Sequence, residues 1–373
     1  MWRKFLLFFL ILMISGCSDN SDKAGTSKQN AASTAQTSST SQLNKYSVLD
    51  SYEVGKDVYV RSTFVDEEER ALWVGTSIGV HEIDLDSFGV RRTFTREDGL
   101  ANEYVFAIGK DSQDSIWFGT NAGGVSSLKG DKWKTYFPMH GLADYWVYSF
   151  ASHPDGSLWI GTWAGVNRLD LDSDKMETYV KELINEWVYA IEIDSKQRIW
   201  FGTEGGISLY DGKTWKEWEH KDGLGAPNTA QLPASTNTGL GTRNRHDLGI
   251  LNSGSQTYNP NYVFSLELDH DDSLWAGTWG GGVSHFDGKK WQSYSTREGL
   301  PGNVVYSLAR DKYGVLWAGT NNGLALFRNG SWTVFSENQT MQGLNIYTLA
   351  ATSDGEIWAG TNGKIFRIGT VKK

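Results

Sequence analysis

The side chains that could carry acid–base or metal chemistry are scattered along this chain. Seven histidines form no His-x-His pair of the kind that binds metal ions; they are His81, His140, His153, His220, His246, His270 and His285. Asp170, Asp172 and Asp174 have the spacing that opens a calcium loop, but the sixth position lacks glycine and Lys181 replaces the bidentate glutamate at the twelfth. We therefore expect a hairpin turn there, and we assign no catalytic residue, metal site or cofactor.

The N-terminus has the pattern of a secretory signal peptide. Residues 1–16 begin with the basic pair Arg3 and Lys4, continue through an apolar run from Phe5 to Ile14, and end in small residues. This run is about half as long as the roughly 20 residues that a membrane-spanning helix needs. We expect the segment to be removed on export.

Cys17 is the only cysteine of the chain, which excludes a disulfide framework. With the preceding Ile14-Ser15-Gly16 it resembles the lipobox of bacterial lipoproteins. The resemblance implies that Cys17 is lipidated and anchors the chain in a membrane of the bacterial cell envelope. It also implies that Ser18 directs the protein to the outer membrane, facing the periplasm. Residues 17–44 lack the apolar side chains of a core, so we expect a disordered tether there.

Several aromatic and basic side chains could bind a ligand. Exposed indole and phenol rings stack on sugars, aromatic compounds or peptide side chains, and arginine offers a planar fork to carboxylate, sulfate or phosphate groups. The candidate ligand-binding residues are Trp146, Trp163, Trp187, Glu204, Tyr262 and Trp279, with Arg243, Arg245 and His246 as an anion-recognising loop. Whether they meet depends on the elements that carry them.

A repeated unit organises the chain from residue 45 onward. The motif Trp-x-Gly-Thr occurs seven times, and its copies begin at Trp73, Trp117, Trp159, Trp200, Trp275, Trp317 and Trp358. Successive copies are 44, 42, 41, 75, 42 and 41 residues apart, so one insertion interrupts a constant period. A constant period of this length is typical of repeat architectures, which include closed propellers and open solenoids. An open solenoid would leave sheet edges exposed at both ends, which favours a closed ring.

Each period reads as four short strands separated by turn residues. In residues 105–137, for example, apolar runs alternate with polar or glycine-rich turns. The third turn contains Asp211-Gly212, Asp287-Gly288 or Asn329-Gly330 in three copies, which favours two-residue hairpins. Seven four-stranded units predict an all-β, seven-bladed β-propeller over residues 45–373. The last copy lacks its fourth strand, and we expect Tyr46–Tyr52 to complete that blade and close the ring.

The candidate residues occupy positions that differ between copies. One position follows the motif threonine, and the other precedes the first strand, where we align Asp57 with Tyr104 and Trp146 of the next copies. In a propeller both turns lie on one face around the axis, so exposed aromatic side chains should gather there. The alternative is that these rings only fill the channel. The insertion, at about 225–260, should emerge on the same face, and its arginines could instead pair with Asp222 or Asp247.

The repeat resembles the two-component regulator propeller family. The resemblance is carried by Glu298-Gly299-Leu300, then Val305-Tyr306-Ser307-Leu308, then Leu316-Trp317-Ala318-Gly319-Thr320 and Gly323-Leu324. It implies the propeller fold and a place in the periplasmic part of a sensor. Since the sequence contains no kinase region and no spanning helix after the propeller, we expect any signal to pass through a protein partner.

Composition and charge narrow the classes of function. With 39% hydrophobic residues and 17 tryptophans the chain can build a large core, and its formal net charge of −9 argues against nucleic acid as a partner. We predict a lipid-anchored sensory or accessory component that binds a glycan, an aromatic compound, an anion or a protein partner at the channel mouth. The alternatives are a non-enzymatic scaffold of an envelope complex and, third, a propeller lyase.

Overall fold

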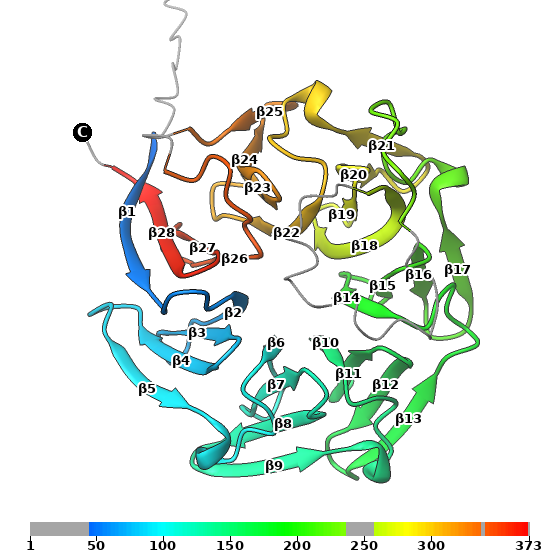
Figure 1. Ribbon diagram of the computed structural model, residues 1–373. Helices are drawn as coiled ribbons and strands as arrows, with labels where there is room; N and C mark the ends of the chain where they lie inside the picture. The colour runs from blue at the N-terminus through cyan, green and yellow to red at the C-terminus, as the bar shows by residue number, and fades with distance from the viewer. Residues whose placement is uncertain (1–44, 236–256, 337–339, 372–373) are drawn as a thin grey trace, which may run out of the picture. The chain divides into compact units, whose positions relative to one another are not determined.

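The computed structural model describes residues 45–235, 257–336 and 340–371. Within these ranges, seven antiparallel sheets of four strands each surround a common axis as the blades of a β-propeller (Figure 1). The first strand of each blade lies nearest the axis and the last lies at the rim (Figure 1). The predicted fold is confirmed.

Blades 1 to 4 follow one another along the chain. Blade 1 contains β2 (Val60–Asp66), β3 (Ala71–Thr76), β4 (Gly79–Asp84) and β5 (Val90–Phe94). Blade 2 contains β6 (Val105–Lys110), β7 (Ile116–Thr120), β8 (Val125–Lys129) and β9 (Lys132–Tyr136). Blade 3 contains β10 (Val147–Ser152), β11 (Ser157–Thr162), β12 (Gly165–Asp170) and β13 (Lys175–Tyr179). Blade 4 contains β14 (Val188–Ile193), β15 (Ile199–Thr203), β16 (Ile207–Tyr210) and β17 (Trp215–Trp218).

Blades 5 to 7 complete the ring. Blade 5 contains β18 (Asn259–Leu268), β19 (Leu274–Trp279), β20 (Val283–Phe286) and β21 (Trp291–Tyr294). Blade 6 contains β22 (Val305–Arg310), β23 (Leu316–Thr320), β24 (Gly323–Arg328) and β25 (Ser331–Val334). Blade 7 contains β26 (Thr348–Ala351), β27 (Ile357–Gly360), β28 (Lys364–Thr370) and β1 (Tyr46–Glu53). Short 3₁₀ helices join rim strands to following blades; they are η1 (Arg96–Asp98), η2 (Pro138–His140), η3 (His220–Asp222) and η5 (Thr296–Glu298).

The glycine of each Trp-x-Gly-Thr motif lets the next blade approach closely. A Cβ atom on Gly119 would lie 2.8 Å from Cγ1 of Val147 in the next blade, and also 2.8 Å from its carbonyl oxygen. The corresponding distance from a Cβ atom to the next blade's Val or Ile methyl is between 2.5 and 3.0 Å in all seven copies. Since non-hydrogen atoms do not pack this closely, any side chain at these positions would push two blades apart.

The tryptophan and threonine of the motif hold the blades together. All seven tryptophans are buried and pack toward the next blade, as Trp73 does against Phe118 with ring centroids 5.7 Å apart. Each threonine hydroxyl donates a hydrogen bond of 2.8–2.9 Å to a carbonyl just after the turn that follows it. The repeated residues are therefore structural.

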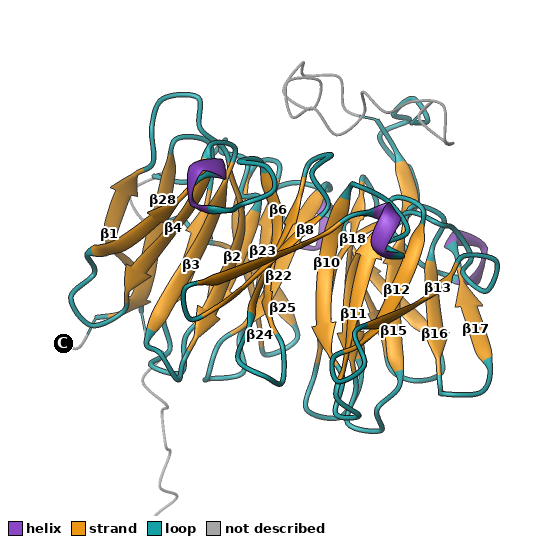
Figure 2. Cartoon of the chain, turned by 90° about the horizontal axis from the view of Figure 1, so that it is seen from below, coloured by secondary structure: helices purple, strands orange, loops and turns teal. Residues whose placement is uncertain are grey.

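The connections between blades explain the recurring Gly-Leu pairs. Thr95 caps η1, and its hydroxyl and backbone N–H both bond to the carboxylate of Asp98. Gly99 then takes a φ of +121°, which side chains disfavour, and Leu100 turns into the core with 3% of its surface exposed. Figure 2 shows that the short helices lie toward one end of the blades. We call this the entry end, because the first strands begin there.

The N-terminal strand closes the ring as predicted. β1 pairs antiparallel with β28, from Tyr46 opposite Thr370 to Glu53 opposite Lys364. Tyr46 is buried against Trp317 of blade 6, with ring centroids 4.8 Å apart, and its hydroxyl donates a hydrogen bond to Asp311. Burial raises the pKa of this hydroxyl far above its usual range, and the Asp311 carboxylate adds to the effect. β1 thereby contacts both of the last two blades.

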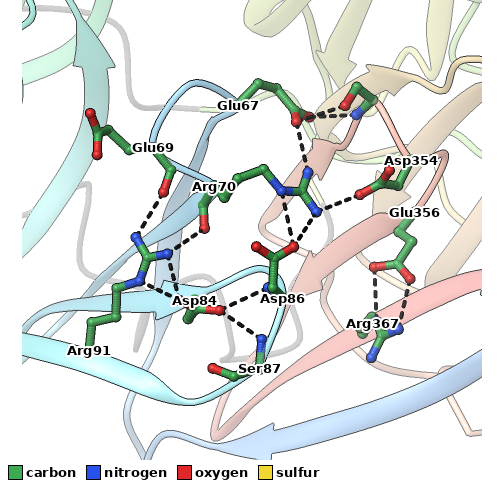
Figure 3. Close-up of polar contacts among 11 residues, drawn as sticks. Glu67, Glu69, Arg70, Asp84, Asp86, Ser87, Arg91, Asp354, Glu356 and Arg367 are labelled. Carbon is green, nitrogen blue, oxygen red and sulfur yellow. Dashed lines mark hydrogen bonds and ion pairs between the residues drawn. The ribbon is translucent and has the colours of Figure 1, made fainter.

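Ion pairs cross the seam between blades 1 and 7 (Figure 3). Arg70, in the turn between β2 and β3, pairs with Asp354 of blade 7 at 2.7 Å, and with Asp86 and Glu67 of its own blade at 2.9 and 3.2 Å. Glu67 in turn accepts a 2.7 Å hydrogen bond from the hydroxyl of Ser353. The network lies at the end of the ring opposite the entry end, because the β2–β3 turn is there.

Two turns differ from the expected two-residue hairpins. Asp211-Gly212 and Asp287-Gly288 each begin a four-residue turn, since Tyr210 pairs with Trp215 and Phe286 pairs with Trp291. The carboxylate of each aspartate accepts backbone N–H groups inside the turn, which stabilises the longer form. Asn329-Gly330 does form a two-residue turn, and both residues have positive φ.

Candidate ligand-binding site

Side chains of the first strands form a closed ring around the axis. At the start of each inner strand, a Val or Ile packs against the motif glycine of the preceding blade and is followed by a residue directed to the axis; in blade 7 these two residues, Ile346 and Tyr347, immediately precede β26. These seven residues, which we call the girdle, are Arg61, Phe106, Tyr148, Tyr189, Phe264, Tyr306 and Tyr347. Their aromatic rings contact one another in sequence, with centroids 4.9–5.8 Å apart from Phe106 round to Tyr347. Arg61 closes the circle between Tyr347 and Phe106.

The predicted ligand-binding residues lie above the girdle, at the entry end. Backbone hydrogen bonds place the two variable positions of a blade side by side, as from Trp163 N–H to the Trp146 carbonyl at 3.1 Å. The equivalent bond in blade 4 runs from the Glu204 N–H to the Trp187 carbonyl at 3.2 Å. In blade 1 the position before the first strand belongs to Tyr59 and not to Asp57, because β2 begins at Val60, two residues later than the sequence alignment implied.

The structure brings the predicted aromatic residues into one cluster. Trp146, Trp163 and Trp187 contact in series, with centroids 5.0 Å apart and rings nearly perpendicular. Tyr262 stacks on Trp279 at 5.8 Å. Tyr189 of the girdle lies 4.7 Å from Tyr262 between ring centroids, and it belongs to the same buried cluster as Trp163 and Trp187. Blades 3, 4 and 5 therefore share one aromatic cluster, and the predicted gathering of these residues is confirmed.

The expectation that these rings are exposed is wrong. Trp187 is 1% exposed, Trp163 3%, Tyr262 5% and Trp279 9%, while Trp146 is half-buried. The rings lie at the narrow inner edge of the blades, where large side chains from neighbouring blades fill the space edge to face. The indole N–H of Trp279 also donates to the Thr257 hydroxyl at 2.9 Å. The alternative that the rings fill the channel describes their packing better.

Glu204 is buried within this cluster. It is 4% exposed, and one of its carboxylate oxygens lies 3.5 Å from the Tyr189 hydroxyl. Burial raises the pKa of Tyr189 and of Tyr148 well above the usual value near 10. Both hydroxyls therefore stay protonated at neutral pH and remain hydrogen-bond donors.

Four predicted functional residues lie outside the described residues. They are Cys17, Arg243, Arg245 and His246. The described residues that flank the insertion are tied together, because the Tyr258 hydroxyl donates to the Ala226 carbonyl at 2.8 Å. The insertion lies between η3 and β18 along the chain. The first residue of β18, Asn259, pairs with Trp279 at the entry end.

The described part of the chain has few candidate residues for binding a catalytic metal ion or for nucleophilic attack. No group of three or more His, Cys, Asp or Glu side chains there could hold a metal ion. Asp170 and Asp174 shape the turn between β12 and β13, which confirms the expected hairpin; Asp174 also contacts Lys134 at 2.6 Å. Gly75-Thr76-Ser77-Ile78-Gly79 has the spacing of a nucleophile elbow, but it joins two strands, and the Ser77 hydroxyl accepts the Tyr59 N–H.

Arg61 is the functional candidate that the sequence reasoning missed. The residue that follows the Val or Ile of the first strand is aromatic in six blades and arginine in blade 1. The comparison of copies that identified the other positions would have found it, had blade 1 been aligned on Val60. The two-residue misalignment hid the exception.

A comparison with protein-family models identifies the family of these repeats. The model of the two-component regulator propeller matches residues 99–122, 141–164, 182–205, 257–280, 299–322 and 340–363. Each match begins in the segment that precedes the first strand of a blade and ends just beyond the Trp-x-Gly-Thr motif of that blade. For blade 5 this preceding segment follows the insertion. The repeats belong to the two-component regulator propeller family. Blade 1 of this regulator propeller lies outside the matches. A search of curated proteins finds no match to the sequence.

Solved structures share the fold of this chain. One is described as the extracellular domain of the hybrid two-component system BT3049 from B. thetaiotaomicron, with 23% identity, a TM-score of 0.65 and 84% of this chain covered. The corresponding domain of BT4673 has 20% identity, a TM-score of 0.62 and 87% coverage. The chain spans 39% of each of these two domains. Virginiamycin B lyase from Staphylococcus aureus has 12% identity and a TM-score of 0.63, with 88% of this chain and 100% of the lyase covered.

The helices in the described part of the chain are short. None of them in the described ranges has the length and apolar character that crossing a bilayer requires.

Proposed function

We propose that this regulator propeller is a sensory or accessory component of the bacterial cell envelope that binds a ligand or a protein partner at its entry end. The proposal rests on the positions at which the residues differ from one blade to another. The motif residues repeat in all seven blades, whereas blades 3 to 5 alone contribute the cluster of Trp146, Trp163, Trp187, Tyr262 and Trp279 beside Glu204. A fold that needs only regular packing does not require this asymmetry.

The cell-envelope location rests on the sequence and on the kind of proteins that share the fold. The signal peptide pattern and the lipobox-like Ile14-Ser15-Gly16-Cys17 support export and a lipid anchor, and Ser18 supports the outer membrane. Propellers of similar fold occur in the extracellular domains of two hybrid two-component systems. We propose that lipidated Cys17 tethers the propeller to the outer membrane, facing the periplasm, and that Arg243, Arg245 and His246 recognise an anionic group.

A thermal-shift screen of the full-length chain, purified from the cell envelope, tests the binding proposal. The probes are oligosaccharides, aromatic compounds, anions and short peptides. A ligand at a hundred times its dissociation constant raises the melting temperature by about 3–5 °C. We expect the shift to disappear in Trp146→Ala, because this indole is half-buried at the entry end.

The matched control is Trp133→Ala, which removes a half-buried indole from the rim strand β9. This variant should keep the ligand shift even if its melting temperature falls. Equal loss of the shift in both variants would show a general effect on stability and would count against a site at the entry end. No shift with any probe class would contradict small-ligand binding by this protein.

A second candidate function is a scaffold that binds another envelope protein. The observation that favours it is the connection between β9 and β10 at the entry end, where Met139 is 85% and Tyr145 45% exposed. The scaffold hypothesis predicts a complex of defined size in gently solubilised membranes. We expect Tyr145→Ser to reduce that complex to the monomer while the ligand screen stays negative; an unchanged complex would contradict this role for the connection.

A further inference from the structure

The guanidinium of Arg61 carries a charge that the surrounding described residues do not neutralise. Arg61 is half-buried in β2, and its guanidinium carbon lies 5.3 Å from the ring centroid of Phe106 and 5.7 Å from that of Tyr347. Its Nε is sealed from solvent and has no hydrogen-bond partner in the described ranges, and no ion pair found there includes Arg61. A cation removed from water is normally paired with an anion.

The neighbouring rings compensate this charge in part. Cation–π contacts with Phe106 and Tyr347 are attractive, but they do not replace the hydrogen bonds that a guanidinium makes in water. The tyrosines supply no negative charge, because burial raises the pKa of Tyr148 and Tyr306 above its usual value although Arg61 lowers it slightly. The girdle thus contains one positive charge and no anion.

Solvent still reaches this girdle. Arg61, Tyr148, Phe264 and Tyr306 each keep part of their surface exposed, whereas Phe106, Tyr189 and Tyr347 are buried. Since the Nε of Arg61 is sealed, the exposed part of its guanidinium is the pair of terminal Nη groups or the stem beside them. A small molecule at the axis would therefore meet aromatic rings and an arginine.

We propose that Arg61 anchors the carboxylate of a small aromatic acid at the axis of the propeller. The planar guanidinium matches a carboxylate, and the girdle rings pack against the aromatic body. A sugar fits less well, because the girdle has no Asp, Glu, Asn or Gln side chain to bind several hydroxyl groups. The inference deepens the proposed function and rests on it, since it names the ligand class for a site directly below the aromatic cluster.

Isothermal titration calorimetry of the full-length chain with benzoate tests this inference. We expect saturable binding of benzoate, and binding at least about tenfold weaker for benzamide, which lacks the charge, and for acetate, which lacks the ring. Arg61→Met removes the charge while keeping a long side chain, and should weaken benzoate binding at least about tenfold. Arg61→Lys keeps the charge without the planar fork and should give an intermediate affinity.

The control variant is Arg297→Met, which removes an exposed arginine of η5 far from the girdle. It should bind benzoate as the parent does, and circular dichroism should show the same strand signal for every variant. Three results would overturn the proposal: no benzoate binding by the parent, equal binding by Arg61→Met and the parent, or equal binding of benzamide and benzoate by the parent.

The proposed function and this inference can fail separately. A ligand response that Trp146→Ala removes and Arg61→Met leaves unchanged would keep the binding function and overturn the aromatic-acid site. Benzoate binding that depends on Arg61 but not on Trp146 would support the axial site and remove the entry-end cluster from ligand recognition.

Discussion

Single residues of the repeat have roles that their contacts explain directly. Asp111 is 5% exposed, and its carboxylate accepts the indole N–H of Trp117 at 2.7 Å and the backbone N–H of Ser115 at 2.9 Å. The matching aspartate in blade 6, Asp311, bonds to Trp317 in the same way. In blade 3 the position is His153, and the Trp159 N–H finds no hydrogen-bond partner in the described residues. The seven motif tryptophans thus share burial and not hydrogen bonding.

Adding one methyl group to a motif glycine should destabilise the protein. In Gly119→Ala the new Cβ would meet both the side chain and the carbonyl of Val147, and a carbonyl cannot move aside without shifting β10. We expect the free energy of unfolding to fall by about 1–3 kcal/mol, measured by urea denaturation. Gly89→Ala is the control, because its Cβ would meet no atom closer than 3.6 Å. Equal effects of the two substitutions would contradict the packing explanation.

The first strands are the elements on which the site depends. They hold the girdle near the entry end and two acidic side chains further along, Glu192 on β14 and Glu267 on β18. Burial raises the pKa of Glu192 to about 8, with a contribution from Glu267, and burial raises the pKa of Glu267 to about 7. Two of the first strands, β14 and β18, therefore carry a protonatable carboxyl group in addition to a girdle residue.

Glu192 should make stability depend on pH. The folded chain binds a proton at Glu192 up to about pH 8, whereas the unfolded chain releases it near 4.5, so stability falls as the pH rises through this interval. We expect the free energy of unfolding to decrease by roughly 1–3 kcal/mol between pH 5 and 8. Glu192→Gln should flatten the decrease, and the exposed Glu97→Gln should not. The measurement is urea denaturation at a series of pH values; parallel curves for parent and Glu192→Gln would refute the effect.

At the scale of the whole molecule, ring closure depends on chain segments far apart in sequence. β1 supplies the fourth strand of blade 7, and Tyr46 reaches Asp311 and Trp317 of blade 6. Without β1, the backbone groups of β28 that face it would lack partners, and an open sheet edge invites aggregation. The ion pairs at the seam between blades 1 and 7 join partly exposed side chains.

Removing the closing strand should cost far more than removing the seam ion pairs. Deleting residues 1–53 should lower the free energy of unfolding by more than about 3 kcal/mol, because the paired strand and buried Tyr46 are lost. Deleting residues 1–44 removes none of these contacts and is the control. Calorimetric melting of the two truncations compares them, and equal melting temperatures would exclude a closing role for β1.

Arg70→Ala should have a small, salt-dependent effect. Its partners Asp86 and Asp354 are more than half exposed, so water and salt screen their attraction to the guanidinium. We expect less than about 1 kcal/mol of destabilisation at low salt and a smaller difference in 1 M sodium chloride. Thermal melting at the two salt concentrations measures it. A large effect that salt does not change would indicate packing of the arginine stem instead.

The blade number, the four-strand unit and the closing strand were predictable from the sequence alone, because each blade repeats the same local requirements. A Trp that fills the space between blades, a Gly that lets the next blade approach and a Thr that ties a turn recur at a fixed period. The sequence also predicted correctly that Trp163 and Tyr262 belong to one cluster. The tertiary structure decided their burial and the position of Arg61 in the girdle. Both depend on how seven inner strands converge on an axis, where the space for each side chain is set by neighbours from other blades.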